Sequence, residues 1–296
     1  MTSARTSTDK ERSALIGVGF MLTATVLMAA DSVIVKHLDG SVHPFVMAFT
    51  RALFGLLAFL PWIVSRKDVL KSHYRFRHVL RAGLKLASLI AFFVAFVEAP
   101  LADVTAIAFT SPIFVTLGAW LFLTERPRAL RILAVALGFV GVLIVLRPGS
   151  AAGISMGLLF ALLGAVLTAT IQLILKPMSA RDSTETLVAW NLIVTVPLAA
   201  IPAAFYWQMP TGTEWGWLAL QGVLGAISMG CVTRAFSLAE ATLLVPLDFL
   251  RLPLVAALGF IIFAETVPLS TWAGGAVIFG ATVIMARSAR GRRAGD

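Results

Sequence analysis

Charge is scarce in this sequence of 296 residues. Asp, Glu, Lys and Arg make up 13% of it, whereas 59% of the residues are hydrophobic. Soluble domains carry about 25% charged residues, so a water-soluble fold could not cover this much apolar surface. The apolar residues form continuous runs rather than alternating with polar ones, which argues against a transmembrane β-barrel. The composition therefore predicts an all-α integral membrane protein.

Residues that form disulfides or bind metals are also few. The one cysteine, Cys231, lies inside an apolar run, and the four histidines fall between runs. No group of residues has the spacing of a metal site, and no Walker motif is present. A membrane enzyme acting on lipid-linked substrates would need His, Asp or Cys clustered near one interface. We therefore expect no metal, no cofactor and no catalytic residues.

Long apolar runs are what the sequence has instead. They lie near residues 13–35, 44–64, 79–97, 101–124, 129–146, 153–175, 187–207, 214–238, 242–264 and 269–286. A helix that crosses a bilayer needs roughly 17–25 such residues, so the runs predict ten transmembrane helices joined by short loops. For the first run the alternative is a cleaved signal peptide ending near Ala30, although the run is long for that purpose.

Basic residues define an orientation for these helices. Most of the 24 Lys and Arg residues lie in one set of alternate loops, whereas the opposite loops hold only Lys36 and Arg147. Because positive loops stay in the cytoplasm, both termini are predicted to be cytoplasmic, as an even number of spans requires. This bias also explains the net charge of +9. We expect a multi-pass protein of the inner (plasma) membrane, with the lipid bilayer and not nucleic acid as its surroundings.

Two parts of the chain repeat one pattern. Ala95-Phe96-x-x-Ala99 is followed by Pro112, Gly118 and Glu125, and Ala235-Phe236-x-x-Ala239 is followed by Pro253, Gly259 and Glu265. Chance similarity between apolar helices is the alternative to a true repeat. If each repeat has five helices, an odd number, the two repeats cross the membrane with opposite orientations. Inverted repeats of this kind typically hold a transport site at their interface. The expected organisation is a disordered cytoplasmic tail (1–12), two repeats (13–148 and 149–287) and a basic cytoplasmic tail (288–296).

The second half of the first repeat resembles a known family. It contains Ser111-Pro112-Ile113-Phe114, Gly118, Leu123-Thr124-Glu125, Gly138-x-x-Gly141 and Arg147-Pro148. This pattern resembles the EamA-type branch of the drug/metabolite transporter superfamily. The resemblance extends to the ten spans and so covers nearly the whole chain. Asp31-x4-Lys36, followed by Pro44 and Arg51-Ala-Leu-Phe-Gly, is similar to the subgroup of riboflavin and S-adenosylmethionine uptake carriers. The resemblance implies two inverted five-helix repeats and a pathway between the first, third, fourth, sixth, eighth and ninth spans.

Five charged residues inside the predicted spans are the main candidates for substrate binding: Asp31, Arg51, Lys85, Asp248 and Arg251. Each charge costs about 2.5–3.5 kcal/mol at a helix centre, so each needs a partner or a wet cavity. Depths counted at about 1.5 Å per residue predict an Asp31–Arg51 ion pair. They also predict a cluster of Lys85, Asp248 and Arg251 with one net positive charge. A role in helix packing alone is the alternative for both groups.

Other residues of the spans are weaker candidates. Two polar residues could line the pathway, Gln172 and Asn191. Three prolines are predicted to break or kink the fourth and ninth spans and to serve in gating, unless neighbouring helices simply tolerate the kinks: Pro112, Pro246 and Pro253. The GxxxG pair Gly153 and Gly157 is typical of close helix packing and is compatible with a homodimer.

These features together predict a secondary transporter that moves a small organic metabolite by alternating access. A cavity with net positive charge favours aromatic or anionic ligands, so the first expectation is uptake of a riboflavin-like or nucleoside-like metabolite. Export of amino acids or related metabolites, as in the wider family, is the alternative. A structural or signalling membrane module would not need five buried charges. The segment from Val245 to Arg251 is where we expect the substrate, because its charges have no counterpart in the first repeat.

Overall fold

The computed structural model describes residues 2–66, 70–123, 129–147, 155–178, 181–239, 244 and 247–290. These residues form helices and turns and contain no β-strand. The predicted all-α class is therefore confirmed for the part of the chain that the structure describes.

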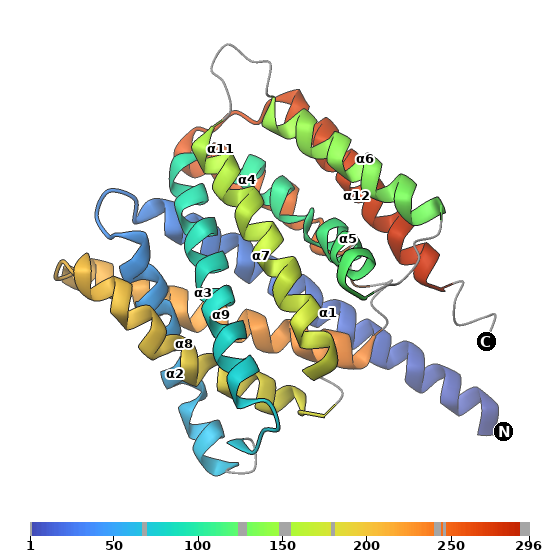
Figure 1. Cartoon of the computed structure of the whole chain (residues 1–296), viewed down its shortest axis with the longest axis horizontal. Helices are drawn as coiled ribbons and strands as arrows, with labels where there is room; N and C mark the ends of the chain where they lie inside the picture. The colour runs from blue at the N-terminus through green and yellow to red at the C-terminus, as the bar shows by residue number, and fades with distance from the viewer. Residues whose placement is uncertain are drawn as a thin grey trace.

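The helices follow the apolar runs of the sequence (Figure 1). In the first half they are α1 (Thr2–His37), α2 (Pro44–Ser65), α3 (Arg75–Glu98), α4 (Leu101–Ala108), α5 (Ser111–Leu123) and α6 (Ala129–Leu146). In the second half they are α7 (Met156–Met178), α8 (Thr184–Phe205), α9 (Gly212–Leu238), α11 (Arg251–Phe263) and α12 (Leu269–Arg290). Seven stretches of the described chain are long and apolar enough to cross a membrane, and α6, α11 and α12 contain shorter apolar stretches. The chain is a multi-pass membrane protein.

The first helix begins earlier than the sequence indicated. It starts at Thr2, so residues 2–12 are helical, and the expectation of a disordered tail is wrong for them. These residues include no Gly or Pro that would stop a helix from growing backwards from the apolar run. Later helices begin at polar caps. Ser183 accepts a hydrogen bond from the backbone N–H of Thr186 in α8, and Thr211 forms a capping box with Glu214 in α9.

Two of the candidate prolines lie next to interruptions in the helices. α4 ends at Ala108 and α5 begins at Ser111, which places Pro112 in the first turn of α5. Proline is tolerated there because its missing N–H is not needed, whereas inside a continuous helix it would break a backbone hydrogen bond. Pro253 lies in the first turn of α11, where its missing N–H is not needed. Pro246 lies outside the described residues. The break in the fourth span is as predicted, whereas a role in gating stays a prediction.

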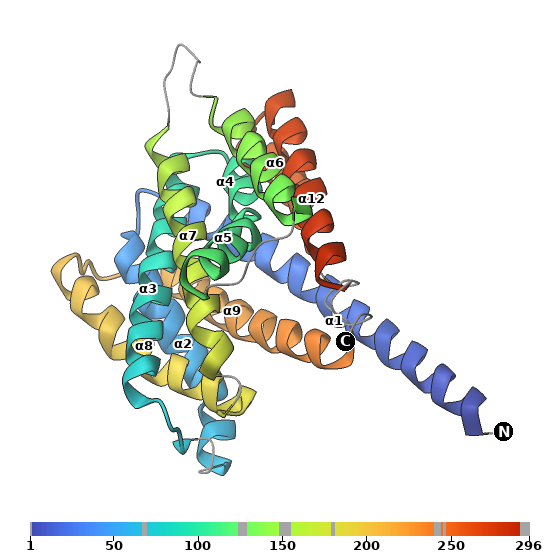
Figure 2. The same ribbon diagram turned by 45° about the vertical axis from the view of Figure 1, so that its right-hand side comes forward.

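The packing of the helices is reciprocal between the two halves. α1 packs against α9 and α11, and α7, the corresponding helix of the second half, packs against α3, α4 and α5. Corresponding helices also pair with each other: α2 with α8, and α6 with α12. α4 packs against α11, which is the counterpart of α5. Figures 1 and 2 show α6 and α12 side by side at one edge of the bundle. Such an arrangement is what two repeats related by an approximate twofold axis produce.

Individual contacts obey the same symmetry with an offset of 140 residues. A Cβ at Gly17 would lie 2.8 Å from the Cβ of Ala239, and a Cβ at Gly157 would lie 2.9 Å from that of Ala99. Phe109 and Phe249, also 140 residues apart, stack on each other with ring centroids 4.1 Å apart. The axis therefore passes close to this pair of rings. The repeat in the sequence is a real repeat of structure, and Gly157 serves packing within the chain.

The two ends of the chain lie on the same side of the molecule. Both views place the first turns of α1 and the last turns of α12 at the same end of the bundle. This placement agrees with an even number of membrane crossings. The number of crossings and the cytoplasmic location of this end stay predictions.

Candidate functional site

A cavity of about 400 Å³ lies between α1, α2, α3, α8 and α9. Much of its lining consists of residues that correspond in the two repeats. Three such pairs, each 140 residues apart, are Arg51 and Asn191, Gly55 and Thr195, and Lys85 and Gly225. Because corresponding residues face the same space, the cavity lies on the approximate twofold axis, at the interface between the repeats.

The chemistry of the cavity is not symmetrical. The first repeat supplies two cations, Arg51 and Lys85, where the second supplies an amide, Asn191, and a glycine. That glycine, Gly225, makes room for a side chain, because a Cβ there would lie 2.7 Å from Nη2 of Arg51. None of the described residues that line the cavity is acidic. The two repeats thus build one asymmetric, cationic site.

The predicted ion pair between Asp31 and Arg51 is confirmed. Nη1 of Arg51 donates to Oδ2 of Asp31, and the exposed fractions of the two side chains are 20% and 15%. The guanidinium also lies 5.8 Å from the ring centroid of Phe93 in α3. Oδ1 of Asp31 is buried and has no hydrogen-bond partner among the residues that the structure describes. The pair therefore joins α1 to α2 beside the cavity and leaves one acceptor atom unused.

The predicted cluster of Lys85, Asp248 and Arg251 is divided. Arg251 lies 3.6 Å from Asp248 and 4.9 Å from the ring centroid of Phe109, and its Nη1 approaches the sulfur of Met28 at 3.4 Å. Lys85 instead lies 4.0 Å from the sulfur of Met229, and its charged neighbours are Arg81 and Arg51. The expectation was wrong for Lys85 because counting residues gives depth along a helix and not the direction in which the side chain points.

The remaining candidates also differ in where they lie. Asn191 lines the cavity and is 3% exposed, whereas Gln172 is exposed and is not part of the lining. Asp248 and Arg251 do not line the cavity either, although Arg251 interacts electrostatically with Asp31. The charged residues thus follow one another across the bundle, from Arg51 of α2 through Asp31 of α1 to Arg251 of α11. Of these three, Arg51 lines the cavity.

A second cavity adjoins the first. It has a volume of about 680 Å³, and Met229 and Thr233 of α9 line both cavities. From there it extends to Trp62, Arg234 and Ser237, at the ends of α2 and α9. Loops at this end are rich in Lys and Arg, so a path leads from the central cavity toward the predicted cytoplasmic side.

Two ion-pair networks join helices at the opposite end, and sequence reasoning missed both. Nζ of Lys36 donates to Glu265 and, at 3.0 Å, to the carbonyl of Ala99, while Glu265 accepts from the backbone N–H of Leu101 at 3.0 Å. Asp103, which is 2% exposed, accepts hydrogen bonds in the other network. Its donors are Arg147, at 2.9 Å, and Thr271. Asp103 could have been recognised from the sequence, because a carboxylate within an apolar run needs a buried partner.

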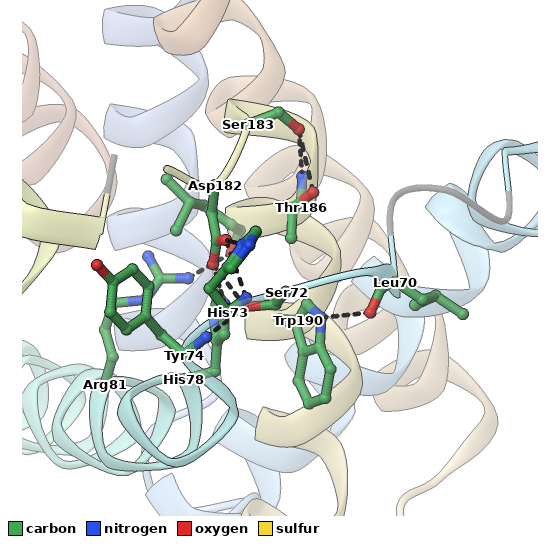
Figure 3. Close-up of polar contacts among 11 residues, drawn as sticks. Leu70, Ser72, His73, Tyr74, His78, Arg81, Asp182, Ser183, Thr186 and Trp190 are labelled. Atoms are coloured by element: carbon green, nitrogen blue, oxygen red, sulfur yellow. Dashed lines mark hydrogen bonds and ion pairs between the residues drawn. The ribbon is translucent and has the colours of Figure 1, made fainter. Parts of the chain in front are cut away.

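A third polar cluster connects the loop before α3 to the loop before α8. Figure 3 shows Ser72, His78 and Asp182 turned toward one another. Oγ of Ser72 lies 2.5 Å from Oδ2 of Asp182 and 2.8 Å from Nε2 of His78, and that nitrogen lies 2.9 Å from the same carboxylate oxygen. His78 is fully buried in α3 and stacks on Trp190, so the prediction that all four histidines lie in loops is wrong.

The cluster does not have the geometry of a nucleophilic triad. Both the hydroxyl and the carboxylate contact Nε2 of His78, and its Nδ1 has no hydrogen-bond partner in the described part of the chain. A catalytic histidine would instead lie between the serine and the aspartate. Burial alone would raise the pKa of Asp182, but hydrogen bonds from Ser72, His78 and the backbone of His73 outweigh it and hold that pKa below its usual value. The cluster ties two loops together.

Comparisons with known proteins agree with this architecture. The sequence model of the EamA-like transporter family matches residues 15–147 and 155–287. An S-adenosylmethionine uptake transporter of Rickettsia bellii is 31% identical over 94% of this chain and 95% of its own length. A riboflavin transporter of Rhizobium johnstonii is 31% identical over 93% and 92%, and the pseudopaline exporter CntI of Pseudomonas aeruginosa is 30% identical over 93% and 97%.

A solved structure shows the same fold. A protein crystal structure with 21% sequence identity superposes with a TM-score of 0.62, covering 97% of this chain and 99% of the other.

Proposed function

Because the chain belongs to the EamA-like transporter family, we propose that it is a secondary transporter that takes up a small organic metabolite by alternating access. The expected substrate is aromatic or nucleoside-like, as riboflavin is. The expected location is the bacterial inner membrane, with both termini in the cytoplasm. Membership of the family makes the protein a non-enzymatic membrane transporter of small metabolites. Substrate, direction and orientation are the proposal.

One observation carries the proposal: the cavity on the approximate twofold axis is lined by corresponding residues of both repeats. A site at the interface between two repeats becomes accessible from either side when the repeats rock against each other. Its volume of about 400 Å³ lies within the range of roughly 300–1,000 Å³ for small-molecule sites. Apolar side chains from all five helices, among them Leu86, Leu89 and Leu192, suit a flat ring system.

The names of the relatives support uptake over export without deciding the substrate. Two of the similar proteins are named for uptake of S-adenosylmethionine or transport of riboflavin, and one is named as an exporter. Export of amino acids or related metabolites is therefore the alternative. The two directions differ in what a cell gains from the protein, so growth can separate them.

Rescue of auxotrophs tests uptake. The chain is expressed in bacterial strains that cannot make riboflavin, S-adenosylmethionine or single amino acids, and growth is scored at low external supply. We expect rescue of a strain that needs an aromatic or nucleoside-like metabolite, and no rescue by a variant in which Gly225→Leu fills the cavity. The matched control is Gly216→Leu, because a Cβ at Gly216 of α9 has no neighbour within 4 Å. Rescue of no strain, with resistance to toxic amino-acid analogues, would favour the exporter.

Fusions test the orientation. A fluorescent protein that matures only in the cytoplasm is attached after Asp296, and alkaline phosphatase, which is active only outside it, is inserted at Gly40. We expect both reporters to be active, because the loop between α1 and α2 is predicted to face outward. If both reporters were inactive, the end of the bundle with the two termini would face outward and not the cytoplasm.

A further inference from the structure

The central cavity contains one charge that the described protein leaves unmatched. Lys85 lies near the middle of the 24-residue α3, and its one polar contact among the described residues is the sulfur of Met229, 4.0 Å away. The charges that act on it, Arg81 and Arg51, have the same sign as its own. Arg51 is already neutralised by Asp31. The ammonium group of Lys85 therefore gives the cavity a net positive charge.

A second group in the same cavity also lacks a partner. Asn191 of α8 is 3% exposed, and its Oδ1 is buried with no hydrogen bond from any described residue. Buried polar atoms are nearly always hydrogen-bonded in folded proteins, and a primary amide offers two donors besides its oxygen. This oxygen can only accept, so the partner that it lacks is a donor in the cavity, such as a hydroxyl or amino group, and the NH₂ group of the same amide can donate to a negative group. Both unmatched groups thus line one space that two repeats enclose.

We propose that Lys85 and Asn191 bind an anionic group of the transported metabolite, a carboxylate or a phosphate. The ammonium group supplies the opposite charge, and the NH₂ group of the amide donates a hydrogen bond to the anion while its oxygen accepts one from a neighbouring neutral group of the ligand. Charge-assisted hydrogen bonds of this kind are about twice as strong as neutral ones. The apolar residues of the lining, such as Met28, Leu89 and Val232, accommodate the rest of the molecule. The proposal rests on the proposed transport function and adds the substrate class.

Other roles for Lys85 do not fit its position. It is about 15 Å along α3 from Arg75, counted at about 1.5 Å per residue, and so lies far from the end of the helix where a lysine could reach water. It makes no ion pair with a described residue, so it does not hold helices together. A leucine or methionine in its place would cost less in the membrane. The charge is therefore useful only when something negative enters the cavity.

Binding of matched compounds tests the proposal. The full chain is purified in lipid nanodiscs, and dissociation constants are measured for two pairs: riboflavin and riboflavin 5′-phosphate, and decarboxylated and intact S-adenosylmethionine. The first pair tests a phosphate and the second a carboxylate. We expect the member with the added anionic group to bind at least about tenfold more tightly in one pair. Lys85→Gln should abolish this preference and leave the other member within about twofold, whereas Lys85→Arg should keep most of it.

A control and a folding measurement complete the design. Arg234→Gln removes the same charge from the adjoining cavity and should leave the preference unchanged. Lys85→Gln should keep or raise the thermal stability of the protein, because no described partner loses its counter-charge and an unmatched charge is removed. Asn191→Leu should weaken binding of the anionic member by a smaller factor. Equal binding within both pairs in the unmodified protein, binding of neither pair, or equal weakening of both members by Lys85→Gln, would overturn the proposal.

Transport is measured separately, so the two proposals can fail independently. Flux of a labelled substrate into proteoliposomes tests the transport function. Flux without a preference for the anionic member keeps the transporter and rejects the anion site. A preference that depends on Lys85, in a protein that supports no flux, keeps the site and rejects the transport function.

Discussion

The contact between Lys36 and Glu265 gives the sharpest quantitative prediction. It joins four helix ends, those of α1, α3, α4 and α11. Lys36 lies in the last turn of α1, and its Nζ donates to the carbonyl of Ala99, which caps α3. Glu265 accepts from the first N–H of α4, that of Leu101. The negative pole of one helix thus faces a cation, and the positive pole of the next faces an anion. Because Glu265 directly follows Ala264, the C-cap residue of α11, the ion pair joins α11 to the junction between α3 and α4.

Its energy can be estimated from the burial of the two side chains, which are 16% and 14% exposed. Fully exposed pairs contribute about 0.2–1 kcal/mol, and loss of one partner of a buried pair costs about 3–5 kcal/mol. For a pair this well shielded we expect each of Lys36→Met and Glu265→Gln to cost about 2 kcal/mol. In the double variant the two losses overlap, so the coupling energy should be about 1–2 kcal/mol.

The assay is a double-mutant cycle on the free energy of unfolding. The folded fraction of each purified variant is followed as the mole fraction of SDS rises in mixed micelles. Asp39→Asn is the matched control for Glu265→Gln, because Asp39 is an exposed acid at the same end of α1. It should cost less than about 0.5 kcal/mol. A coupling energy below about 0.5 kcal/mol would refute the reasoning, because it would mean that the pair acts as an exposed one.

Three further predictions concern separate parts of the molecule. If transport is coupled to protons, Asp31→Asn or Asp248→Asn should abolish the response of flux to a pH gradient in proteoliposomes; unchanged flux in both variants would exclude these carboxylates as carriers. Gly225→Ala should reduce substrate binding about tenfold or more by displacing the guanidinium 2.7 Å from the new Cβ, and Gly216→Ala in the same helix should not. The pKa of Asp182 is lower in the folded protein than in the unfolded chain, so its ionised form stabilises the fold above about pH 4. This stabilisation is lost as the pH falls through the lower folded-state pKa. The variant Asp182→Asn should therefore be less stable at pH 7 and lose less stability on acidification, measured by thermal unfolding.

Much of the fold could be predicted because the membrane restricts it. Backbone groups in lipid must be paired within a segment, so a long apolar run can only be a helix, and the runs gave the helices to within a few residues. The repeat was visible because corresponding positions such as Ala99 and Ala239 must stay small where they face a glycine. The break before Pro112 followed from the missing backbone N–H of proline. Residues 2–12 were missed because polar residues carry no signal of burial.

The site was less predictable, because it depends on directions around the helix axes. Depth alone was sufficient for Asp31 and Arg51, which lie on sequential, antiparallel helices. It failed for Lys85 and Asp248, which lie on helices whose contact faces the sequence does not specify. The segment around Arg251 was favoured because its charges have no counterpart in the first repeat. The same argument, applied to Lys85 and Gly225, would have indicated the cavity that the structure places on the axis.

The distribution of charge separates what holds this molecule together from what is available for a ligand. Among the described charges inside or at the ends of the spans, those of Lys36, Asp31 and Asp103 each have an opposite partner, and the charge of Lys85 has none. An unmatched charge in the membrane opposes folding, and any ligand that neutralises it must therefore stabilise the folded protein. Compounds that raise the thermal stability of the unmodified chain but not of Lys85→Gln should thus identify the substrate class without any knowledge of the transport direction.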